Sequence, residues 1–202
     1  MLFNLTRAVL WLILSAFAVY RINTSGVKRK KLMSVSAVVL CMAVVSVTAL
    51  FPVENLFIHS RSPESIFHYT GSGNIDEIIY GQESCLIVYS KGNSTGGHYI
   101  IPKTENGYKI PNYFTTKRIS HKFDENGLFD IYHVNGTQDY YVFGTVDWND
   151  TDNRIAVYNE MGEKVDTNIV RVENSGFIYF FLHNFAGEYY LQINGEIIPI
   201  NG

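Results

Sequence analysis

Acidic residues are missing from the start of the chain, where none occurs before Glu54. Residues 1–53 carry six Lys and Arg, whereas residues 54–202 carry ten Lys and Arg and nineteen Asp and Glu, a net charge of −9. A basic segment without acids is typical of a membrane surface, where anionic head groups attract Lys and Arg. Nucleic-acid binding needs a basic surface, so we expect no nucleic-acid partner for the acidic remainder.

Cysteine is scarce as well, with two residues in the chain. Cys41 lies in an apolar segment and Cys85 in the acidic part, so we expect no disulfide between them. Eukaryotic secreted domains usually carry disulfides, whereas a domain of about 150 residues can bury enough apolar surface without one. The composition therefore favours a bacterial surface protein over an animal or plant ectodomain.

Two apolar segments, Leu2–Tyr20 and Leu32–Val53, flank a short loop that holds five of the basic residues. Residues 34–53 carry no charge, and at about 1.5 Å per residue a helix of this length crosses a hydrocarbon core of ~30 Å. The first segment contains Arg7, which we expect to reach the head groups. The sequence therefore predicts a transmembrane helical hairpin over residues 1–53, with the lipid bilayer as its partner.

The basic loop, residues 21–31, sets the predicted orientation, because Lys and Arg are enriched in cytoplasmic loops. Residues 54–202 are then exported, both termini lie outside, and the protein is a multi-pass protein of the cell membrane. A cleaved signal peptide ending near Ala16-Phe17-Ala18 is the alternative. Cleavage there would leave five basic residues at an exported N-terminus, which favours the hairpin.

Residues 54–202 show one helix start, Ser62-Pro63-Glu64, followed by short segments rich in Ile, Val, Tyr and Phe. Asn-Gly pairs between these segments favour hairpin turns. We predict a mainly-β extracytoplasmic domain, an antiparallel sandwich or partly open barrel with one short helix, and leave open a division near Asn112. The predicted strands are 75–80, 84–90, 98–102, 108–110, 116–123, 128–134, 140–146, 154–159, 169–173, 177–182, 188–193 and 196–200. Cys85–Tyr89 and Phe177–Leu182 are apolar on both faces, which predicts central strands.

Oxygen side chains at Asp147, Asn149, Asp150 and Asp152 form the one cluster that suggests a metal. An EF-hand loop needs Gly at its sixth position and Glu at its twelfth, where this chain has Asp152 and Tyr158. Asn and Asp also crowd ordinary turns. We interpret the segment as a turn, keep a calcium loop as the alternative, and expect no cofactor.

Other candidate groups have simpler interpretations than catalysis. Cys85 lies in an apolar run and is expected to be a buried thiol. His121 and His133 lie on neighbouring predicted strands, but two histidines make an incomplete metal site. The Gly-rich segment Gly92–Gly97 lacks the Lys-Ser/Thr ending of a phosphate loop and is expected to be a loop between strands. The sequence thus identifies no catalytic residue.

We expect a membrane-anchored binding or interaction domain whose ligand is a protein, a peptide or a cell-wall glycan. Thirteen of the fourteen tyrosines follow Val53, and tyrosine offers both apolar area and a polar tip to such ligands. A membrane-anchored hydrolase with a site built from strand-end loops is the alternative. A third hypothesis gives the function to the hairpin, whose residues Ala37, Ala43 and Ser46 leave room for a partner helix.

The predicted topology can be tested with single cysteines in a background that lacks Cys41 and Cys85. A membrane-impermeant thiol reagent applied to intact cells should label Asn174→Cys and leave Ser25→Cys unlabelled, because the basic loop should be cytoplasmic. Labelling of Ser25→Cys without labelling of Asn174→Cys would contradict the predicted orientation.

Overall fold

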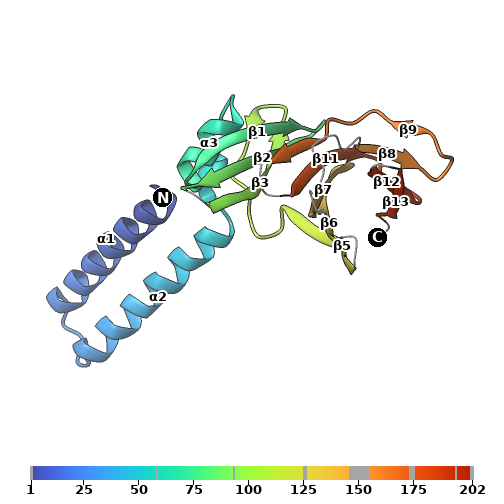
Figure 1. Ribbon diagram of the computed structural model, residues 1–202. Helices are drawn as coiled ribbons and strands as arrows, with labels where there is room; N and C mark the ends of the chain where they lie inside the picture. Colours follow the sequence, from blue (N-terminus) through green and yellow to red (C-terminus); the bar gives the residue numbers. More distant parts are fainter. Residues whose placement is uncertain are drawn as a thin grey trace.

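A computed structural model describes residues 2–57, 59–92, 94–124, 127–145, 155–172, 176–193 and 195–200. Two long antiparallel helices project from one end of a β-rich domain built from three antiparallel sheets (Figure 1). The domain thus agrees with the mainly-β prediction, but it has one more layer of sheet than a two-sheet sandwich.

The helical hairpin consists of α1 (Leu2–Thr24) and α2 (Lys30–Leu50), which are long and apolar enough to cross a membrane by length and composition. Its side chains are sorted in an unusual way. Arg7 and Ser15 are buried between the helices, as are the Trp11 N–H and the Ser34 hydroxyl. Large apolar side chains point outward instead, among them Leu5, Leu12, Ile13, Phe17, Leu32, Val35, Val39, Leu40, Val44 and Val47.

A polar joint connects the hairpin to the domain. The Arg7 guanidinium donates to both carboxylate oxygens of Glu54, at 2.7 and 3.0 Å, and to the Thr48 carbonyl at 2.6 Å. It also lies 3.5 Å from the centroid of the Phe3 ring, which meets Tyr69 edge-on. Arg7 therefore binds the last turn of α2 and the chain that follows it, and its position at the level of the head groups stays a prediction.

The short helices follow this joint. The 3₁₀ helix η1 (Val53–Leu56) carries Glu54, and α3 (Pro63–Thr70) begins where the sequence predicted a helix start. The Ser62 hydroxyl caps α3 by accepting from the Ser65 N–H. One face of α3 buries Ile66 and Phe67 against the first sheet, so α3 covers the outer face of that sheet.

The first sheet has the order β1-β2-β3-β4 and follows the chain in simple hairpins. Its strands are β1 (Asn74–Tyr80), β2 (Ser84–Lys91), β3 (Ser94–Thr104) and β4 (Gly107–Tyr108). Residues 94–97, which we expected in a loop, belong to β3 and pair with the end of β2. The β2–β3 hairpin is therefore longer than the apolar pattern indicated.

The second sheet is the largest and has the order β10-β11-β7-β6-β5. Its strands are β10 (Val170–Val172), β11 (Phe177–His183), β7 (Asp139–Thr145), β6 (Gly127–Val134) and β5 (Thr116–Asp124). The third sheet, of order β13-β12-β8-β9, consists of β13 (Glu196–Pro199), β12 (Tyr189–Ile193), β8 (Ile155–Asn159) and β9 (Lys164–Val165). The two-residue strand β9 had no signal in the sequence.

Three apolar cores separate the layers. One lies between α3 and the first sheet and contains Phe67, Cys85 and Ile101. The next lies between the first and second sheets and contains Leu86, Val88 and Tyr179. The largest lies between the second and third sheets; its buried residues are Phe129, Ile131, Val142, Val157, Ile178, Phe180, Leu182, Tyr189, Leu191, Ile198 and Ile200. Both faces of β2 and β11 are thus covered, as their two-sided apolar patterns predict.

A buried carboxylate holds the first sheet to the second. Asp139, at the start of β7, is fully buried and accepts hydrogen bonds from the N–H groups of Gln82 and Glu83, at 3.3 and 2.8 Å. The Ser84 hydroxyl donates to the same carboxylate at 2.6 Å and also meets the Tyr141 hydroxyl at 3.0 Å. A Cβ on Gly81 would lie 2.5 Å from this carboxylate, so the β1–β2 turn needs glycine there.

Replacement of this carboxylate should be costly. Asp139→Ala removes the acceptor of three hydrogen bonds, one of them from the buried Ser84 hydroxyl, and leaves a void at a fully buried position, so we expect the free energy of unfolding to fall by about 3 kcal/mol. Denaturant unfolding of the full chain in detergent micelles, followed by tyrosine near-UV circular dichroism, measures this loss. The matched control is Asp166→Ala, an exposed acid before β10, which should change the value by less than about 0.5 kcal/mol. Equal effects of the two variants would contradict the role given to Asp139.

Candidate functional site

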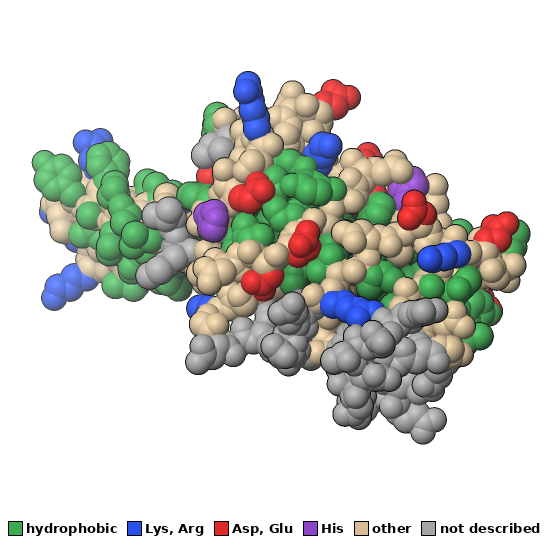
Figure 2. All heavy atoms as spheres, turned by 45° about the horizontal axis from the view of Figure 1, so that its top comes forward, with side chains coloured by type: hydrophobic (Ala, Val, Ile, Leu, Met, Phe, Trp, Pro, Cys, Tyr) green, Lys and Arg blue, Asp and Glu red, His purple; other side chains and the backbone are tan. Residues whose placement is uncertain are grey.

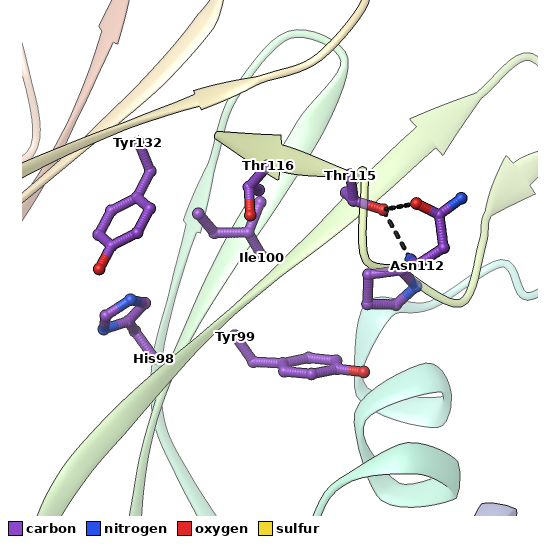
Figure 3. A pocket seen from close by; sticks show the side chains of 8 residues that line it. His98, Tyr99, Ile100, Asn112, Thr115, Thr116 and Tyr132 are labelled. Atoms are coloured by element: carbon purple, nitrogen blue, oxygen red, sulfur yellow. Dashed lines mark hydrogen bonds between the residues drawn. The ribbon is translucent and has the colours of Figure 1, made fainter. Parts of the chain in front are cut away.

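A hollow of about 260 Å³ lies where β3 of the first sheet faces β5 and β6 of the second (Figure 3). Its lining residues come from β3, from the connection between β4 and β5, from the first residue of β5 and from β6. They are His98, Tyr99, Ile100, Pro111, Asn112, Thr115, Thr116 and Tyr132. Such a volume is below the usual range for a drug-sized ligand and fits one side chain or one sugar ring.

The polar end of the pocket is formed by His98 and Tyr132. Their rings lie 5.2 Å apart, and Figure 3 shows the Tyr132 hydroxyl directed toward the His98 imidazole. The opposite end is formed by Tyr99, whose ring points away toward α3 and lies 5.9 Å from Phe67. His98 and Tyr99 point in different directions because adjacent residues of a strand face opposite sides of a sheet.

Burial lowers the pKa of His98 below its ordinary value of 6.5, and the charge of Asp130 offsets part of this effect. The imidazole is therefore neutral at pH 7 and offers one donor and one acceptor. Burial raises the pKa of Tyr132, and the neighbouring Asp130 adds to the shift, so its hydroxyl stays protonated. The polar end of the pocket consequently carries no charge of its own.

Asp130 also binds basic groups on the neighbouring strand. Its Oδ1 lies 2.7 Å from His121 Nδ1 and 3.5 Å from an Arg118 guanidinium nitrogen. A register shift in β5 between Arg118 and Ser120 brings both side chains opposite β6 near Asp130. Arg118 and His121 are half exposed, and both share the Asp130 carboxylate, which offsets the charge of Arg118.

The turn at the edge of the pocket is held by several hydrogen bonds. The Asn112 carboxamide oxygen accepts from the Phe114 N–H at 2.8 Å, and the Asn112 N–H donates to the Thr115 hydroxyl at 2.7 Å. Asn135, at the β6–β7 turn, donates to the Phe114 carbonyl at 2.7 Å and pairs through its own N–H with Thr115. The wall of the pocket is therefore held from both sides.

The candidate residues named from the sequence lie elsewhere. The candidate calcium loop of Asp147, Asn149, Asp150 and Asp152 is outside the described residues. His121 and His133 are not partners: His121 lies opposite Asp130, while His133 stacks on Tyr140. Within the described ranges, no group of three or more His, Cys, Asp or Glu is placed to hold a metal ion.

Cys85 is fully buried in the core between α3 and the first sheet. Burial raises the pKa of its thiol to about 12, with a smaller contribution from Glu64. The thiol is therefore protonated at physiological pH and lacks access to the pocket, which its residue does not line. It packs as an apolar side chain and offers no nucleophile.

Ser84, Asp139 and His183 are the residue types of a hydrolytic triad, and no spacing in the sequence predicts this cluster. Their order in space is wrong for that chemistry, because Ser84 donates directly to Asp139 and His183 Nδ1 lies 3.5 Å from the other carboxylate oxygen. A triad needs the imidazole between the hydroxyl and the acid. Ser84 is also fully buried, so the cluster joins the sheets and has no access to a substrate.

The lowered pKa of His98 predicts a pH dependence of stability. The unfolded chain takes up a proton near pH 6.5 and the folded chain does so only at lower pH, so the free energy of unfolding should fall as pH drops below about 6.5. The free energy of unfolding of His98→Gln should therefore fall less than that of the wild type between pH 7.5 and 5.5. Denaturant unfolding of the full chain measures this difference. His59→Gln, at an exposed histidine, serves as the control and should keep the wild-type dependence. If the free energy of unfolding of His98→Gln depended on pH as that of the wild type does, the lowered pKa of His98 would be contradicted.

Comparison of the chain with protein-family models, with curated proteins and with solved structures gave no match. The functional conclusion therefore depends on the geometry of this chain alone.

Proposed function

We propose that the protein is a membrane-anchored interaction module, with residues 1–53 in the bilayer and the β-rich domain displayed on its outer face. The observation that carries the anchoring is the exposure of many large apolar side chains along both helices of the hairpin. In water, a helix pair turns its apolar stripe inward and its polar side chains outward. Here Arg7 and Ser15 face the partner helix while Leu, Ile, Val and Phe side chains face outward, an arrangement suited to hydrocarbon surroundings.

The distribution of charge supports the orientation. The turn between α1 and α2 holds Lys28 and Arg29, and basic side chains gather at the end of the hairpin away from the domain (Figure 2). At the opposite end, Arg7 is paired with Glu54 and adds no free charge. Basic residues at one end alone favour a cytoplasmic location for that end, which leaves the domain outside.

The pocket beside β3 supports binding as the function of the domain. It joins the Tyr132 ring, a neutral imidazole and the polar groups of Asn112 and Thr116 around a volume suited to one residue of a longer ligand. Aromatic faces with a few polar groups are suited to a peptide side chain or to a sugar ring. The exposed side chains of Lys117 and Arg118 on β5 favour a ligand that carries negative charge next to that residue.

Hydrolysis gains no comparable support. None of the eight lining residues is a cysteine or a carboxylate, and the Thr115 hydroxyl is engaged with Asn112. Cys85 and the Ser84 cluster are buried away from the pocket. A nucleophile next to a base is the minimum for covalent hydrolysis. The His98 imidazole faces the Tyr132 hydroxyl, but the raised pKa of Tyr132 keeps that hydroxyl protonated and weakly nucleophilic.

Binding can be tested with the full chain reconstituted in lipid nanodiscs. The probes are soluble bacterial cell-wall fragments, applied separately as glycan strands and as acidic stem peptides, with affinity measured by calorimetry. Binding of either probe should weaken at least tenfold, or about 1.4 kcal/mol, in His98→Ala and Tyr132→Ala. Met161→Ala, at an exposed side chain on the β8–β9 turn, should bind as wild type does. Absence of binding by both probes, or equal binding by all variants, would contradict the proposed ligand and pocket.

A further inference from the structure

Five large apolar and aromatic side chains are exposed at the junction between the hairpin and the domain. We call this set the collar; its members are Phe51, Leu56, Phe57, Tyr113 and Phe114, with exposed fractions from 50% to 83%. They come from two segments far apart in the sequence, the exit of α2 with η1 and the β4–β5 connection. The Phe51 and Phe114 rings stack at 5.6 Å and so join the two segments.

The β4–β5 part of the collar is held in place although its side chains are exposed. Phe114 is fixed through its backbone by hydrogen bonds from Asn135 and to Asn112. Tyr113 meets the Phe114 ring edge-on at 5.2 Å. Exposed aromatic rings on a well-ordered turn indicate a surface shaped for contact, because a turn without a partner usually carries polar residues at its tip.

The position of the collar identifies what covers it. Phe51 directly follows the last residue of α2, and the outward face of that helix is apolar up to Leu50. The collar is therefore continuous with the surface that we assign to the bilayer. Amphipathic aromatic rings are enriched at the level of the lipid head groups, where one end is apolar and the other is hydrated. Tyr113 has this character.

We propose that the collar is seated in the head-group layer of the outer leaflet, so that the β4–β5 turn rests on the lipid surface. The proposal depends on the membrane anchoring proposed above. The same turn supplies Pro111, Asn112 and Thr115 to the wall of the pocket. The pocket therefore opens beside the bilayer surface, and its ligand is a group presented at or on the membrane.

Depth-dependent fluorescence quenching tests the collar in the full chain in liposomes. Phe114→Trp is made in a background with Trp11→Phe and Trp148→Phe, and lipids carry bromine near the head group or deep in the acyl chain. Emission of the Phe114→Trp probe should be blue-shifted and lost mainly with head-group-proximal bromine. The control is Met161→Trp, an exposed position on the β8–β9 turn at the end of the domain away from the hairpin (Figure 1). Its emission should be unaffected by either lipid.

A third variant distinguishes an error in the collar proposal from an error in the anchoring proposal. Trp148→Phe alone retains Trp11 within α1, and quenching of Trp11 by deep bromine reports insertion of the hairpin. Quenching of Trp11 without quenching of the Phe114→Trp probe would overturn the collar and leave the anchoring intact. Absence of quenching at both positions would overturn both proposals. Equal quenching of the Phe114→Trp and Met161→Trp probes would also overturn the collar, because it would show no preferred seating of the junction.

Discussion

Burial of both faces of the second sheet is the constraint on which the β-rich domain depends. The strands β7 and β11 expose apolar side chains to both sides, so one covering layer leaves half of that surface in water. The first sheet covers one face and the third sheet covers the other. The first sheet is apolar on its outer face too, and α3 with the start of α1 completes that side. The layers are thus linked in series from the hairpin to the C-terminal strands.

One fully buried carboxylate and one partly buried carboxylate connect these parts of the protein. Asp139 joins the second sheet to the β1–β2 turn, and Glu54 joins the domain to α1 through Arg7. Burial alone would raise the pKa of Glu54, but hydrogen bonds and the charge of Arg7 outweigh it and hold the pKa below 4.5. Each carboxylate is satisfied by several donors, which is the condition under which a buried charge stabilises a unique arrangement. The hairpin and the domain are consequently coupled at a defined contact.

This coupling gives the proposed function a geometric basis. A domain on a loose tether would meet the membrane in many orientations, whereas one fixed through Arg7 and Glu54 presents one side to it. The β4–β5 connection lies on that side, with Phe114 stacked on the exit of α2 and Asn112 at the pocket. In the proposed arrangement, the joint and the collar would set which side of the domain faces the bilayer, and the pocket lies next to that side.

Local patterns in the sequence determined the hairpin, the start of α3 and the positions of most strands. Residues within one helix turn or one strand act on each other directly, so periodicity in Phe177–Leu182 or the cap at Ser62 was enough to predict them. The tertiary structure alone decided the third layer, the Arg7–Glu54 pair across 47 residues and the Ser84–Asp139 contact across 55 residues. It also placed His98 next to Tyr132 and Phe51 next to Phe114. Such contacts depend on sheet order, strand register and the register shift in β5, which arise from packing of distant segments and leave no local pattern in the chain.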